Sequence, residues 1–129
     1  MRLEIIVEAK HVRAVHDGPF SLDEARKLFT QILDALVRTG LRDVLVDARH
    51  VTTPPSDADR YEYGAGVAAA VAAFKLKHGG EPRFAYVMAP PVRDPARFGE
   101  TVAVNRGMDV RTFESLDAAL DWLRDAREA

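Results

Sequence analysis

The sequence predicts a single α/β domain with a four- to five-stranded, mostly parallel sheet, an antiparallel edge hairpin and about four helices. The chain has 129 residues, a common size for one domain, and its apolar fraction of 47% and charged fraction of 29% are ordinary for a globular protein. Short β-branched or aromatic runs alternate with longer helical patterns, which implies crossover connections between parallel strands. No linker, composition shift or internal repeat divides residues 1–129.

Two strands are expected at the start of the chain, paired as a hairpin. Leu3–Ala9 is rich in isoleucine and valine, which suit a pleated and largely buried position. His11–His16 alternates imperfectly between polar and apolar residues and is predicted to pair back on the first strand. An Asp-Gly-Pro turn at residues 17–19 closes the unit. This hairpin would supply the antiparallel edge of the sheet.

The best-defined helix is expected to start after Ser21 and to stop at Thr39-Gly40. Ser21 and Glu24 form a capping box, in which the two side chains satisfy free N–H groups of the first turn. Apolar residues then recur on one helical face, and a glycine suits the position just past the last turn. The pattern therefore predicts an amphipathic helix that covers the sheet.

The rest of the chain alternates strand and helix three more times. The strands are predicted from short apolar runs, and the helices from capping residues, prolines at the first helical position and terminating glycines. The expected elements are a strand at Val44–Val46, a helix from Asp57 or Asp59 to about His78, a strand at Arg83–Ala89, a helix opened by Asp94-Pro95 and ending near Gly107, a strand at Val110–Phe113 and a last helix capped by Ser115.

Composition argues against several classes of function. The chain has no cysteine, which excludes a disulfide scaffold, a thiolate zinc site and a cysteine nucleophile. A net charge of −2 with interspersed signs gives no field that would attract nucleic acid. The longest apolar run, Val67–Phe74, is too short to span a membrane, and no signal peptide is expected, so we predict a cytoplasmic location. The four histidines lack metal-ligand spacing, and we expect no metal or cofactor.

A family resemblance rests on three stretches, Val44–Arg49, Asp94–Gly107 and Val110–Phe113 with the helix that follows it. Together they resemble the STAS superfamily, which includes bacterial anti-sigma-factor antagonists, and more closely its small stand-alone STAS/Sec14-like members. The similarity in element order covers nearly the whole chain. It implies helices packed mainly on one side of the sheet, and a non-enzymatic regulatory or binding role through a protein partner or a small ligand.

The resemblance also points to one serine. In the regulators of this superfamily, a serine in an Asp-Ser-Ser/Ala-Gly motif at the start of the second helix is phosphorylated. The corresponding stretch here is residues 54–59, in which Ser56 is the one serine and the serine-glycine end of the motif is missing. Ser56 is therefore a candidate phosphorylation site within an incomplete motif.

Three loops follow the predicted parallel strands, at residues 47–57, 89–94 and 112–115. Ligands of open α/β sheets usually bind outside the carboxyl ends of the strands, and two of these loops lead into helix N-termini, which favour anions. The arginines nearby could bind a small anion, or they could be solvated or paired with neighbouring aspartates. The candidate ligand-binding residues are Asp47, Arg49, His50, Ser56, Asp57, Arg60, Tyr61, Arg93, Asp94 and Arg97.

A small hydrolase or phosphate-handling enzyme is the enzymatic alternative. Asp47, His50 and Ser56 are the residue types of an orienting acid, a base and a nucleophile. No Gly-x-Ser-x-Gly turn presents the serine, however, and two of the three serines are predicted helix caps. No residue is therefore assigned a catalytic role.

The second predicted helix is apolar on two faces. A helix that is apolar all round is usually covered on both sides, although alanine also occurs on exposed faces because of its helix propensity. The stripe expected to face the core is Tyr63, Val67, Ala70, Val71 and Phe74. The second face would contact a protein partner or a second copy of the chain, or would cover an apolar pocket. The Sec14-like resemblance implies an apolar-ligand carrier as an alternative function, which needs such a pocket between the sheet and a helix. Its residues are Ala65, Ala68, Ala69 and Ala72.

Overall fold

The predicted alternation of strands and helices is confirmed by the structure, a computed structural model that describes residues 2–94 and 96–128. Most boundaries differ from the prediction by one or two residues. The elements are β1 (Arg2–Val7), β2 (Val12–Asp17), α1 (Leu22–Thr39), β3 (Asp43–Asp47), α2 (Asp57–His78), β4 (Arg83–Val87), α3 (Phe98–Asn105), β5 (Asp109–Phe113) and α4 (Leu116–Glu128).

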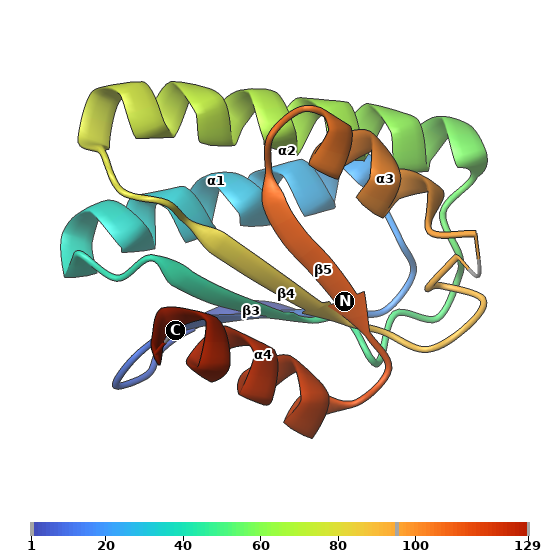
Figure 1. The fold of residues 1–129 in the computed structure, drawn as a ribbon. Helices are drawn as coiled ribbons and strands as arrows, with labels where there is room; N and C mark the ends of the chain where they lie inside the picture. The colour runs from blue at the N-terminus through green and yellow to red at the C-terminus, as the bar shows by residue number, and fades with distance from the viewer. Residues whose placement is uncertain (1, 95, 129) are drawn as a thin grey trace.

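The strands form one sheet in which spatial order follows chain order, β1-β2-β3-β4-β5. β1 pairs antiparallel with β2, and the other pairs are parallel, which confirms the expected edge hairpin. Each of α1, α2 and α3 connects neighbouring parallel strands. Right-handed crossovers in one direction place such helices on the same face. Figure 1 shows these three helices on one face of the sheet and α4 on the other.

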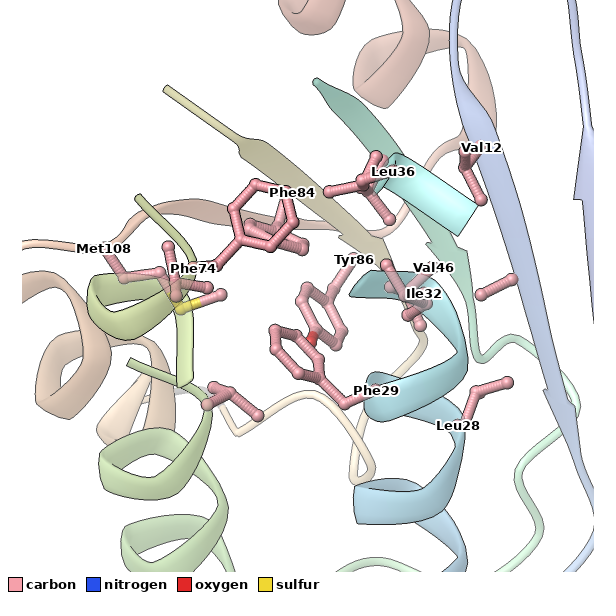
Figure 2. Packing of buried hydrophobic residues seen from close by; sticks show 14 of the residues in the cluster. Val12, Leu28, Phe29, Ile32, Leu36, Val46, Phe74, Phe84, Tyr86 and Met108 are labelled. Carbon is pink, nitrogen blue, oxygen red and sulfur yellow. The ribbon is translucent and has the colours of Figure 1, made fainter. Parts of the chain in front are cut away.

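The hydrophobic core has two parts, one on each face of the sheet. The larger lies between the sheet and α1, α2 and α3, where Phe29 stacks on Phe84 with ring centroids 5.3 Å apart. Figure 2 shows these aromatic side chains among the aliphatic residues of the cluster. The smaller part packs α4 against the sheet through Leu45, Ala85, Val87, Ala119 and Leu123. The sheet is thus covered on both faces, as parallel sheets usually are.

The second apolar face of α2 is partly covered by the chain itself. Ala68 is buried in the core, so its prediction as an interface residue is wrong. The reason is α3, which packs along α2 at Gly64. A Cβ atom on Gly64 would lie 2.7 Å from the carbonyl oxygen of Gly99, so glycine permits the close approach. Ala65 is half-buried, and the remaining two predicted interface residues, Ala69 and Ala72, are exposed.

α3 begins later than its predicted start at Asp94. The Asp94 carboxylate accepts hydrogen bonds from the backbone N–H groups of Ala96 and Phe98, at 3.2 and 3.0 Å, and so stabilises a turn before the helix. Arg97 then adopts a left-handed conformation with a φ of 54° and precedes the first helical residue. Pro95, the predicted first helical residue, lies outside the described residues.

Candidate functional site

A cavity of about 130 Å³ lies between the sheet and the helices α2 and α3, at the carboxyl ends of the parallel strands. Its floor consists of two neighbouring rows of side chains, because residues two apart on a strand face the same side. One row is Val46, Tyr86 and Thr112, which lie in register on β3, β4 and β5. The next row is His16, Ala48 and Met88.

The walls of the cavity are mainly apolar. They come from the N-terminal half of α2, from α3, from the start of α1 and from the loops that follow β2, β3 and β4. The cavity therefore lies where open α/β sheets usually bind ligands, beyond the carboxyl ends of the strands. Apolar wall residues include Phe20, Leu28, Pro55, Val67, Val92 and Met108.

A tyrosine in the wall of the cavity meets one in its floor. The hydroxyl oxygens of Tyr63 on α2 and Tyr86 on β4 are 2.6 Å apart, and the rings meet edge to face. Burial raises the pKa of Tyr63 to about 12, although the hydrogen bond with Tyr86 opposes this rise, and burial raises the pKa of Tyr86 as well. Both side chains are thus neutral at pH 7. One hydroxyl donates to the other, and the acceptor keeps its own proton available for a further bond.

Among the described residues, His16 is the one histidine that lines the cavity. Its residue is 5% exposed, and its Nε2 atom is buried with no hydrogen-bond partner in the described part of the chain. Burial lowers the pKa of His16, and the charges of Asp17 and Glu24 only partly oppose this effect. His16 is therefore a neutral imidazole at pH 7 with an unused hydrogen-bonding atom.

Charged side chains line the rest of the cavity in equal numbers of each sign. They are Arg60, Arg93, Arg97, Asp59, Asp94 and Glu100. Arg93 donates to the hydroxyl and to the carbonyl oxygen of Thr112, at 3.0 and 3.3 Å. Arg60 donates to the Asp57 carboxylate at 3.2 Å and to the Pro91 carbonyl at 2.9 Å. These two guanidinium groups are thus already bound within the protein.

The structure brings four of the ten predicted ligand-binding residues to the cavity: Arg60, Arg93, Asp94 and Arg97. Asp47 does not reach it, because it lies on the opposite face of the sheet and accepts hydrogen bonds from Arg13 and Arg49. Burial alone would raise the pKa of Asp47, but the hydrogen bonds from the side chain and backbone of Arg49 and from Arg13 lower it to about 2. Asp47 and Arg49 therefore form an ion pair that supports the fold.

The other predicted residues lie outside the cavity. Ser56 is exposed, and its hydroxyl accepts a hydrogen bond from the backbone N–H of Asp59, which caps α2. His50 is exposed in the loop after β3, and Tyr61 is exposed beside Arg106. Asp57 is exposed and pairs with Arg60. Within residues 2–94 and 96–128, no hydrogen bond joins Asp47, His50 and Ser56 into a catalytic triad.

Sequence reasoning missed the polar residues of the cavity floor and wall. His16 follows Val12 and Ala14 at a spacing of two, so a regular strand would have placed all three on one face. This two-residue spacing is the one local signal that could have predicted that His16 is buried. Nothing in the local pattern shows that Tyr86 and Glu100 face the same space, because they come from different elements.

A metal site and a membrane-spanning helix are both absent from the described residues. These residues contain no group of three or more histidine or acidic side chains that could hold a metal ion. None of the helices they form has the length and apolar character that crossing a bilayer requires.

A scan against protein-family models and a search of curated proteins found no match. Several solved structures share the fold. The unphosphorylated anti-sigma factor antagonist SpoIIAA is 12% identical with a TM-score of 0.59, and the two chains are covered to 96% and 97%. An anti-sigma factor antagonist from Mycobacterium paratuberculosis is 19% identical with a TM-score of 0.59 and coverage of 96% and 94%. An uncharacterised Shewanella loihica protein with a SpoIIAA-like fold is 18% identical with a TM-score of 0.50 and coverage of 95% and 92%. The chain therefore has the fold of these anti-sigma factor antagonists, which is the fold that the STAS resemblance implied.

Proposed function

We propose that this protein is a non-enzymatic regulatory module that binds a small, mainly apolar ligand in the cavity between the sheet and α2 and α3. The observation that carries the proposal is the cavity itself, with its apolar walls and its place at the carboxyl ends of the strands. A dry apolar cavity of about 150 Å³ accommodates benzene, so the volume here suits a molecule of about one ring.

The charges around the cavity support an apolar ligand better than an anion. The three arginines there are matched by three carboxylates, and Arg60 and Arg93 already donate to protein oxygens. A bound anion would have to displace these internal partners. The dispersal of Asp47, His50 and Ser56 likewise favours binding over hydrolysis.

A protein partner is the second component of the proposal. Two similar structures are named as anti-sigma factor antagonists, which act on another protein. In this chain, Ala69 and Ala72 of α2 and Phe98 and Val104 of α3 are exposed apolar residues. Because α2 and α3 also wall the cavity, a ligand there would stabilise the same helices that a partner or a second copy would contact. A cytoplasmic location and phosphorylation at Ser56 stay predictions.

The first experiment is native mass spectrometry of gently purified protein, followed by NMR titration with toluene as the probe. Toluene is expected to shift the amide signals of residues around the cavity and to raise the melting temperature. Ala48→Leu, on the cavity floor, should abolish these effects, whereas Ala69→Leu, the same change on the exposed face of α2, should retain them. Absence of any toluene-dependent shift in the unaltered protein would contradict the proposed ligand site.

A further inference from the structure

The outer edge of β1 is a row of main-chain groups with no hydrogen-bond partner among the described residues. β1 pairs with β2 alone, so its other side is an edge of the sheet. The Glu8 N–H donates to the His11 carbonyl at 2.9 Å, which marks this pair as hydrogen-bonded. Because bonded and non-bonded pairs alternate along an antiparallel ladder, the N–H and C=O groups of Leu3, Ile5 and Val7 point outward.

The opposite edge of the sheet, at β5, is closed by side chains. The N–H of Thr112 donates to the Glu100 carboxylate, and the C=O of Thr112 accepts a hydrogen bond from Arg93 at 3.3 Å. In the described part of the chain, β1 has no such cover. Its six residues include neither lysine nor proline, and its register with β2 is unbroken by a bulge. An edge of this kind is a template for pairing with another strand.

We propose that two copies of this protein pair through β1 and form a dimer with one continuous sheet. Most dimers have a two-fold axis, and an axis perpendicular to the sheet brings the two β1 strands together antiparallel. With the axis at Ile5, the two Ile5 residues exchange hydrogen bonds, and Leu3 of each copy does so with Val7 of the other. The pairing involves neither α2 nor α3, so it is independent of the proposed ligand site.

The charges of β1 and of the turn that follows it select this register. With the axis at Ile5, Arg2 lies opposite Glu8 of the second copy, and Glu4 lies opposite Ile6. An axis at Glu4 would bring the two Glu4 carboxylates together, and an axis at Ile6 would place Glu4 opposite Glu8. Like charges directly opposite one another destabilise a strand pair. The register centred on Ile5 is thus the one of these three that pairs opposite charges.

Pairing through β1 also buries apolar surface. The side chains of Leu3 and Ile5 pack against the larger core, and Val7 lies on the same face of the strand because residues two apart share a face. Val7 is 50% exposed. In the dimer, Leu3 of the second copy lies directly across from Val7 and covers it.

α1 carries a charge pattern that fits the same symmetry. The helix packs over β1 and β2, and Leu33 lines the groove between α1 and α2. At 3.6 residues per turn, Glu24 and Arg38 lie on the opposite side of α1, toward the free edge of the sheet. The two-fold axis makes the two α1 helices antiparallel, so the Glu24 end of one lies beside the Arg38 end of the other.

Sedimentation equilibrium at micromolar to millimolar concentrations tests the dimer. The unaltered protein should reach twice the mass of one chain. Val7→Pro removes an outward N–H and no bond to β2, a change that edge strands tolerate. It should weaken the dimer about thirtyfold, because symmetry removes two hydrogen bonds. Val7→Thr keeps the N–H and should dimerise like the unaltered protein. A monomer at all concentrations, or a dimer that Val7→Pro leaves unchanged, would overturn the proposal.

A cross-linking experiment tests the register and does not depend on the folding of Val7→Pro. The chain has no cysteine, so Glu4→Cys and Ile6→Cys each introduce one thiol. Residues opposite one another in a non-bonded antiparallel pair have Cα atoms about 4.5 Å apart, within the range of a disulfide. Oxidation of a mixture of the two variants should therefore give the covalent heterodimer, and either variant alone should stay uncrosslinked. No heterodimer, or a homodimer of either variant alone, would overturn the pairing centred on Ile5.

Discussion

The hydroxyl of Tyr63 lies 2.6 Å from the hydroxyl of Tyr86, so a hydrogen bond inside the core joins α2 to the central part of the sheet. The Tyr86 residue is 7% exposed, and its position among the aromatic and aliphatic side chains is visible in Figure 2. Through this bond, the helix that walls the cavity is connected to its floor.

The first prediction concerns this pair. Tyr63→Phe or Tyr86→Phe alone should lower the free energy of unfolding by about 1–2 kcal/mol, because each leaves the other hydroxyl without its partner. The double variant should be less destabilised than the sum of the two single variants. Urea denaturation of the four proteins measures the coupling, and strict additivity would show that the bond contributes nothing specific.

The second prediction concerns acid stability. The pKa of Asp47 falls from 3.8 to about 2 on folding, so its carboxylate stabilises the native state above pH 4, and this contribution is lost as the pH falls to 2. At 1.36 kcal/mol per pKa unit, the contribution is about 2 kcal/mol. Asp47→Asn should be destabilised at pH 7 and should lose less stability between pH 4 and pH 2 than the unaltered protein. Asp57→Asn, at an exposed position, is the control, and an identical acid profile for Asp47→Asn would contradict the prediction.

The third prediction uses two glycines of one helix. Gly64→Ala should destabilise the protein by about 1–2 kcal/mol, since the new Cβ would meet the Gly99 carbonyl oxygen at 2.7 Å and force α3 away from α2. Gly66→Ala should stabilise it by about 0.5–1 kcal/mol, because no atom lies within 4 Å and alanine is the better helix former. Thermal denaturation measures the change in stability of both variants. If both changes had the same sign, the contact between α2 and α3 would not require a glycine at position 64.

The fourth prediction concerns the attachment of α4. The guanidinium of Arg83 lies over the ring of Trp122 at 3.9 Å and pairs with Asp109 at 2.9 Å. Arg83→Met keeps an apolar stem but loses both contacts, and should cost about 2 kcal/mol. Hydrogen exchange should become faster mainly in α4. If the faster exchange were spread evenly over the sheet and α1, Arg83 would be a support of the whole core and not of α4 in particular.

The order of elements could be predicted because its signals are local. The Ser21 cap and Gly40 sit next to the helix that they delimit, and the predicted cap is observed as a hydrogen bond from the Glu24 N–H to the Ser21 hydroxyl. The start of α3 could not be predicted in the same way. Asp94 has the residue type of a helix cap, but its carboxylate binds N–H groups of a turn that ends only at Arg97.

The candidate site was harder to predict, because it depends on which face of the sheet each residue occupies. Arg60, Arg93, Asp94 and Arg97 were expected near one another because they follow the carboxyl ends of strands, and all four line the cavity. The same reasoning placed Asp47 on the wrong face of the sheet. Its strand is buried on both faces, so the sequence has no alternation of polar and apolar residues that would distinguish one face from the other. Only the packing of α4 on one face and α1 to α3 on the other resolves this ambiguity.

The sequential order of the strands also has a consequence for how the chain folds. Every strand pairs with its neighbour in the chain, so no pairing has to wait for a distant segment, and the entropy lost in closing each loop stays small. The hairpin, α1 and β3 can assemble while the remainder of the chain is still being synthesised, and later strands can add one at a time. α4 comes last and closes the opposite face, so we expect its docking to complete folding.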